Sequence, residues 1–179
     1  MYASTFDDGP YLNDATPEAL RILKERGVKA TFYQVGYLAF LRKELVQEIN
    51  DDGHTIAMHG YLHANLSAEG RSGAYREIYS DYDMLYRNFG HREYKHYRPS
   101  YGELDQFDVL RNDTGFSLDF WSINTRDWYW NLIANQNESW TEEEKQELGR
   151  CATDPYTCNT IFTHDRWLVC QQFWTTLKS

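Results

Sequence analysis

The sequence predicts an α/β fold, in the form of a distorted, incomplete (β/α)7-8 barrel. Short segments rich in β-branched and aromatic residues alternate with helix-like segments, an order typical of a parallel sheet. About six or seven such units favour a barrel over an open sheet. Polar and ionisable residues also follow several of the predicted strands, at the end where the active sites of α/β barrels collect.

The individual elements are expected in a regular order. An apolar strand over 2–6 ends abruptly at the turn sequence Gly9-Pro10. A helix follows, because Thr16 is a good N-cap residue and Pro17 suits the first helical position. Later strands are placed where β-branched and aromatic residues are enriched, and later helices between them. The remaining strands are expected at 29–35, 55–59, 96–99, 117–123 and 159–164, and the remaining helices at 41–50, 74–88, 107–110 and 142–150.

Length and composition favour a single domain, residues 1–179, with a core of ordinary size. Apolar residues make up 41% of the chain and charged residues 25%, which is normal for a globular protein. The net charge of −9 argues against nucleic acid or an anionic membrane as a partner. Aromatic residues reach 16%, and such side chains can also stack on sugar rings.

The cysteines and the glycosylation sequons favour a protein that is secreted or held in a cell wall. Cys151 and Cys158 bracket a short loop and are placed for a local disulfide in an oxidising compartment, which leaves Cys170 over. Met1 lies almost at the first strand, so we expect a mature domain that is truncated at both ends. The three N-x-Ser/Thr sequons begin at Asn65, Asn112 and Asn137.

Two adjacent carboxylates, Asp7 and Asp8, end the first predicted strand. Like charges side by side repel, so either a cation or a proton neutralises one of them, or both stay in water. Charged residues are mostly exposed, which makes a solvated pair the ordinary interpretation. Because strand alternation sends neighbouring side chains to opposite sides, the two carboxylates are also free to have different roles.

Two histidines four residues apart, His59 and His63, can bind the cation that neutralises one carboxylate. Residues i and i+4 of a helical turn share a face, so both imidazoles can reach one ion, although two ordinary surface histidines are the alternative. Together with Asp8 they offer two nitrogens and one oxygen. Three protein ligands are typical of a catalytic site, because positions remain open for water and substrate. We expect one divalent ion, Zn²⁺ in the first place, with Co²⁺ or Ni²⁺ also accepted.

Further ionisable residues at predicted strand ends complete a hydrolytic set. Asp7 would be free to act as general base toward water, with Arg98 held against it by a charge-assisted pair. A surface salt bridge is the alternative for Arg98. His164 is a candidate general acid, and Asp127 would fix its tautomer. Trp128 is expected either as a wall of the site or as a core aromatic.

These residues fall in short motifs that resemble those of a known family. The motifs match, in order and over essentially the whole chain, the polysaccharide deacetylases with a NodB homology domain, carbohydrate esterase family 4. The first motif is a near-complete match, and the ordered set is most similar to fungal chitin deacetylases. The motifs are Thr5-Phe6-Asp7-Asp8-Gly9-Pro10, His59 to His63, Arg98-Pro99-Ser100-Tyr101-Gly102, Asn124-Thr125-Arg126-Asp127-Trp128 and Ile161-Phe162-Thr163-His164-Asp165.

The resemblance implies the same roles as the residues do, and it adds two more. The backbone N–H of Tyr101 would donate to the oxyanion, and Phe162 would line the pocket for the acetyl methyl group. Three departures from the family pattern stand out. Gly60 replaces a Ser or Thr whose hydroxyl could brace the metal loop, Asn124 replaces an Asp, and Phe162 replaces a smaller Leu. The implied roles are base for Asp7, metal ligands for Asp8, His59 and His63, orienting residues for Arg98 and Asp127, and acid for His164.

The expected activity is hydrolysis of N-acetyl groups from chitin or chito-oligosaccharides, with release of acetate, by a monomer whose partner is the polysaccharide. Chitin is preferred to peptidoglycan because sequons, paired cysteines and acidic charge suggest a fungal-like secreted protein. An acetyl xylan esterase with the same site is a close rival. A catalytically inactive carbohydrate-binding relative is the alternative of a different class, favoured by Gly60, Phe162 and the short segment after the fifth motif.

Overall fold

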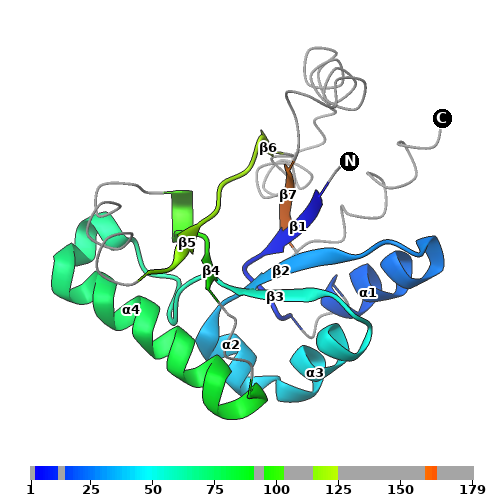
Figure 1. The fold of residues 1–179 in the computed structure, drawn as a ribbon, viewed down its shortest axis with the longest axis horizontal. Coiled ribbons are helices and arrows are strands. Elements are labelled where there is room, and N and C mark those ends of the chain that lie inside the picture. Colours follow the sequence, from blue (N-terminus) through cyan, green and yellow to red (C-terminus); the bar gives the residue numbers. More distant parts are fainter. Residues whose placement is uncertain (1–2, 12–14, 91–94, 103–114, 125–159, 165–179) are drawn as a thin grey trace, which may run out of the picture.

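In the part of the chain that the structure describes, seven strands form one sheet in which every strand pairing is parallel. A computed structural model describes residues 3–11, 15–90, 95–102, 115–124 and 160–164. The strand order is β5-β4-β3-β2-β1-β7-β6 (Figure 1). The strands are β1 Ala3–Asp7, β2 Ala30–Gln34, β3 Thr55–Met58, β4 His96–Tyr97, β5 Ser117–Leu118, β6 Ile123–Asn124 and β7 Thr160–His164, and the helices are α1 Ala15–Arg26, α2 Gly36–Leu41, α3 Lys43–Asp51, α4 Leu66–Phe89 and the 3₁₀ turn η1 Ser100–Gly102.

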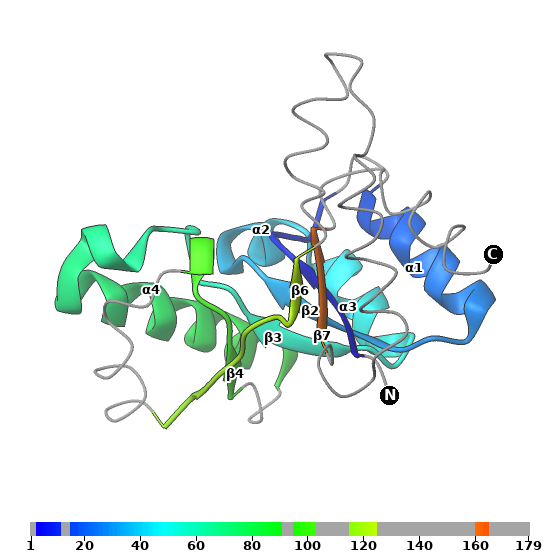
Figure 2. The ribbon, with the colours of Figure 1, turned by 90° about the horizontal axis from the view of Figure 1, so that it is seen from above.

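The two edges of the sheet come close together, so the sheet curls into an incomplete barrel. β5 and β6 are the edge strands, yet only residues 119–122 separate them in the chain. An extended connection of that length spans at most about 18 Å. Seven strands in a flat sheet, spaced about 4.8 Å apart, would place the edges about 29 Å apart. The predicted incomplete barrel is therefore confirmed, and the curl is visible in Figures 1 and 2.

The two faces of the sheet differ in chemistry. The helices lie along one face (Figure 1), where Phe6 stacks on Phe32 with ring centroids 4.9 Å apart in the buried core. On the opposite face, Thr5 and Asp7 alternate with Phe6 along β1, and Tyr33 is the β2 partner of Asp7. An apolar helix-facing layer thus fixes the position of a polar inner layer, because side chains alternate along each strand.

Several predicted elements differ from those observed. The helix expected over 41–50 is α3, and the sequence did not predict α2, which ends just before α3 because Arg42 between them is non-helical (φ −133°, ψ 49°). The helix expected over 74–88 is preceded in α4 by a first turn at 66–69, which the side chain of Asn65 caps by accepting from Ala68 N at 3.2 Å; a kink at Gly70 (φ 62°, ψ −179°) separates the two parts. The strand expected over 117–123 is β5 and β6, on opposite edges of the sheet. The helices expected at 107–110 and 142–150, the three cysteines and two of the sequons lie outside the described residues.

Helix α2 packs tightly against α4, and we expect Gly36→Ala to destabilise the fold by about 1–3 kcal/mol through overpacking. A Cβ at Gly36 would lie 2.6 Å from Asp81 Oδ1 and 2.9 Å from Tyr61 Cδ2. Urea unfolding measures the change. Leu41→Ala is the control, because Leu41 lies in the same helix with 53% of its surface exposed and should shift stability by no more than about 0.5 kcal/mol. Equal midpoints for Gly36→Ala and wild type would contradict the close contact.

Candidate active site

The carboxylates of Asp7 and Asp8 approach the same imidazole at the C-terminal end of β1. Asp7 Oδ2 lies 3.7 Å from His59 Nε2, and Asp8 Oδ1 lies 3.2 Å from the same atom. The backbone of Asp8 is left-handed, with φ 73°, which ends the strand alternation there. The expectation that the two side chains leave the strand on different sides therefore fails: both carboxylates serve one site.

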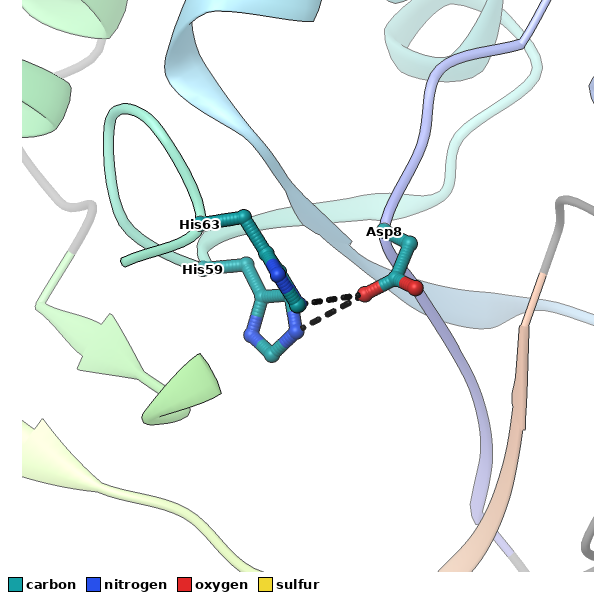
Figure 3. Close-up of side chains that lie close together, drawn as sticks. All are labelled: Asp8, His59 and His63. Atoms are coloured by element: carbon teal, nitrogen blue, oxygen red, sulfur yellow. Dashed lines mark ion pairs between the residues drawn. The ribbon is translucent and has the colours of Figure 1, made fainter. Parts of the chain in front are cut away.

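His59 and His63 meet at the carboxylate of Asp8 (Figure 3). Asp8 Oδ1 lies 2.9 Å from His63 Nε2, and one ligating atom from each of the three residues lies within 4.8 Å of the others. The helical turn expected for this pair is wrong, because residues 59–65 form a loop with positive φ at Gly60 (91°) and His63 (58°). The spacing of four still brings the imidazoles together, with ring centroids 5.1 Å apart.

The donor set fits a divalent cation. His59 Nδ1 lies 2.8 Å from the Arg98 carbonyl oxygen, which can only accept, so Nδ1 carries the hydrogen and Nε2 presents a lone pair. Burial lowers the pKa of His59, but the charge of Asp7 and the hydrogen bond to Asp8 outweigh it, so this pKa lies above its usual value. A cation would compete with that proton. Two imidazole nitrogens and one carboxylate oxygen suit Zn²⁺ and accept Co²⁺ or Ni²⁺.

Arg98 is fully buried and holds the inner face of β1. Its Nη1 donates to Asp7 Oδ1 at 2.6 Å and to Thr5 Oγ1 at 3.0 Å, and the side chains of Arg98 and Asp7 are both 0% exposed. The guanidinium carbon lies 3.9 Å from the centre of the Tyr33 ring and 5.7 Å from that of Trp121. The two aromatic rings thus hold the planar guanidinium of Arg98, and its hydrogen bond fixes the orientation of the Asp7 carboxylate.

Backbone strain gathers at this site. Among the described residues, the non-glycine residues with positive φ are Asp8, His63 and Tyr101. Tyr101 lies in η1, directly after Arg98-Pro99, and its ring centroid is 4.7 Å from that of His63. Left-handed backbone in residues with a Cβ costs free energy and persists where the surroundings enforce it, often at functional sites.

A cavity of about 610 Å³ opens over the three candidate ligands. This volume suits a small organic ligand or one part of a longer chain. Aromatic and aliphatic side chains form much of its wall, among them Tyr37, Leu62, Tyr101 and Trp121. Sequence reasoning missed all of these except Tyr101. Trp121 lies within the segment expected to be one strand, so its place between two strands gave no signal.

Two buried carboxylates of α4 support the histidine loop, and sequence reasoning missed them as well. Asp81 accepts from the backbone N–H groups of His59 and Gly60, and Glu77 accepts from that of Leu62. Burial raises the pKa of Asp81 well above its usual value, and the two backbone donors oppose that rise. A signal was present: both acids lie on the apolar stripe of α4 with Ala74, Ile78 and Leu85.

The remaining predicted residues are placed only in part. Cα pairing in the sheet puts His164 beside Asp7, and Phe162 beside Thr5 and Asn124. Asn124 also lines the cavity. The side chains of β7 are not described, and Asp127 and Trp128 lie outside the described residues.

A family model and the sequences of individual proteins both match this chain, and both indicate the same family. A family model for polysaccharide deacetylase matches residues 1–114. A peptidoglycan-N-acetylglucosamine deacetylase of Bacillus cereus is 36% identical over 127 residues, which cover 70% of this chain and 46% of that protein. A chitooligosaccharide deacetylase of Sinorhizobium fredii is 35% identical over 127 residues, covering 69% and 58%. This chain therefore spans about half the length of these curated relatives.

A solved structure extends the similarity to nearly the whole chain. The Bc1960 peptidoglycan N-acetylglucosamine deacetylase, crystallised with an N-oxidanyl-benzamide compound, superposes with a TM-score of 0.76. The alignment covers 99% of this chain and 81% of that one at 30% identity. The curled parallel sheet is thus the fold of that protein too.

Proposed function

The chain belongs to the polysaccharide deacetylase family, and on that premise we propose that it is a metal-dependent hydrolase of N-acetyl groups. The proposed substrate is the N-acetylglucosamine of chitin or chito-oligosaccharides, and the products are acetate and the free amine. One observation carries the proposal: the candidate ligands Asp8, His59 and His63 share a cavity wall with Asp7, whose carboxylate is paired with the buried Arg98. These relatives are bacterial, so they do not support the expected similarity to fungal chitin deacetylases in particular.

The chain's own residues suffice for the proton transfers of amide hydrolysis. When bound, the ion would lower the pKa of water and polarise the acetyl carbonyl. Asp7, oriented by Arg98, takes a proton from the attacking water. The backbone N–H of Tyr101 donates to the oxygen that becomes negative. In this proposal His164, which Asp127 would orient, gives a proton to the leaving nitrogen as the C–N bond breaks.

The proposed partner is a polysaccharide bound by a monomer. The net charge of −9 disfavours polyanions such as nucleic acid. In the part of the chain that the structure describes, no helix has the length and apolar character needed to cross a membrane. Secretion or retention in a cell wall remains our proposal from the sequons and cysteines.

Acetate release from three substrates, with and without a chelator, tests the proposal. We expect release from chitin oligomers with added Zn²⁺ and its loss by at least about 100-fold on chelation, because the ion supplies several kcal/mol of transition-state stabilisation. A peptidoglycan fragment is the second candidate substrate, favoured by the names of the similar proteins. Acetylated xylan tests the esterase alternative. A folded, metal-loaded protein that releases acetate from none of the three would favour an inactive carbohydrate-binding relative.

A further inference from the structure

We propose that Glu77 and Asp81 of α4 are positioning residues for the metal ligands, because their carboxylates hold the loop that carries His59 and His63. The inference rests on the metal site of the proposed function. It concerns the geometry of that site and not the substrate. The loop, residues 59–65, connects β3 to the start of α4, so its ends are fixed by the sheet and by the helix.

The carboxylates of α4 bind the loop through its backbone. Asp81 Oδ2 accepts from His59 N at 3.1 Å and from Gly60 N at 2.9 Å. Glu77 Oε2 accepts from Leu62 N at 2.9 Å and from Ala64 N at 3.4 Å. Four backbone donors on the two sides of His63 therefore reach one pair of side chains, and one of them, His59 N, is shared with the Gln34 carbonyl at 2.9 Å. These bonds set the path of the loop independently of the imidazoles.

The opposite side of the loop is bound by other elements. Ser100 Oγ donates to the His59 carbonyl at 2.8 Å, and the backbone N–H groups of Gly36 and Tyr37 donate to the carbonyls of Gly60 and Tyr61 at 3.0 and 2.9 Å. The loop is thus held between its acceptors on α4 and its donors on α2 and η1. Such a two-sided arrangement restricts rotation of the whole loop.

Because the two α4 carboxylates are buried, they depend on hydrogen bonds from the loop. Asp81 is 0% exposed and Glu77 is 7% exposed, on a helix face otherwise packed in the apolar core. A buried carboxylate is costly unless hydrogen bonds compensate it. Among the described residues, the loop N–H groups are the donors recorded for both acids. The hydrogen bonds from the loop N–H groups therefore offset most of the free-energy cost of burying the two carboxylates.

Gly60 allows this close approach. A Cβ at Gly60 would lie 3.2 Å from Glu77 Oε2, 3.5 Å from Ser100 Oγ and 3.6 Å from Tyr97 Oη, and the residue has φ 91°. The hydroxyl that the motif lacks at this position is therefore replaced by oxygens from α4 and η1 around the loop. In this chain the support for the metal loop lies outside the loop.

Zn²⁺ affinity of Glu77 and Asp81 variants, measured by competition with a chromophoric chelator, tests the inference. Glu77→Asp is one methylene shorter and cannot keep both loop bonds, and Asp81→Ala removes both of its own. We expect each to weaken Zn²⁺ binding by about 10–100-fold. Glu77→Gln and Asp81→Asn keep an acceptor oxygen in place, so we expect affinity within about 3-fold of wild type. Asp83→Ala is the matched control on α4, an exposed acid paired with Arg87, and should leave affinity unchanged.

A merely structural role gives a different result. It would lower the melting temperature of the metal-free variants while leaving the Zn²⁺ affinity of the folded protein unchanged, and that outcome overturns the inference. If Asp81→Ala does not fold, the comparison of Glu77→Asp with Glu77→Gln decides. A wild-type protein that binds Zn²⁺ and releases no acetate would overturn the proposed function alone. A wild type that binds no Zn²⁺ would overturn both.

Discussion

An Asp7→Asn variant is expected to release acetate about 10²–10⁴-fold more slowly than wild type while it keeps its Zn²⁺ affinity. An amide has the shape of the carboxylate and still accepts from Arg98, but it cannot take a proton from water. Asp7 Oδ2 is also the more distant carboxylate oxygen, 3.7 Å from His59 Nε2, whereas Asp8 Oδ1 lies 3.2 and 2.9 Å from the two imidazoles. The geometry thus supports the proposal that the two neighbouring acids have separate roles.

The check is a pair of measurements on two variants. Acetate release and Zn²⁺ affinity are measured for Asp7→Asn and for Asp8→Asn, with circular dichroism to establish that both fold. We expect Asp8→Asn to lose both metal and activity, because it removes a charged ligand. If Asp7→Asn loses the metal and Asp8→Asn keeps it, the base and the ligand have been interchanged.

The position of the site could be predicted from the sequence because of how parallel sheets are built. Asp7, His59 and Arg98 each come directly after a stretch of apolar strand, and parallel strands deliver their C-terminal ends to one rim. Strand identity and direction therefore suffice to bring them together. The same argument places His164 at this rim, and in the sheet the Cα of His164 pairs with that of Asp7.

The geometry inside the site could not be predicted, because it depends on left-handed backbone. Asp8, His63 and Tyr101 each have positive φ, a conformation that residue type favours only for glycine and, more weakly, Asn or Asp. Strand alternation and helical spacing are rules for regular structure. Strand alternation fails at Asp8 and helical spacing fails in the segment 59–65, because tertiary contacts override both rules there.

The role of α4 was hidden for a different reason. The place of Glu77 and Asp81 on the apolar stripe of α4 indicates that they are buried, but their partners are backbone N–H groups, which residue identity does not reveal. The division of 117–123 into β5 and β6 was likewise invisible, because a two-residue strand is too short to show periodicity. Two short strands close together in the chain became opposite edges only through the curl of the sheet.

Arg98→Met is expected to lower the free energy of unfolding by about 3–5 kcal/mol, because it removes the guanidinium that pairs with the buried Asp7 carboxylate. Methionine fills much of the space between the Tyr33 and Trp121 rings, so a cavity contributes little. Urea unfolding of the metal-free protein measures the loss. The metal must be absent, because a nearby cation would itself compensate Asp7 and hide the effect.

The double variant Arg98→Met with Asp7→Asn separates the pair from its surroundings. If Arg98→Met lowers the free energy of unfolding because the Asp7 charge is uncompensated, removing that charge should recover most of the lost free energy. The double variant should then be clearly more stable than Arg98→Met alone. Losses that simply add would mean that Arg98 stabilises the fold through Thr5 and the two rings and not through Asp7. In that case the pair would serve the orientation of the base and not the stability of the barrel, because a buried ion pair need not stabilise a fold in order to fix a geometry.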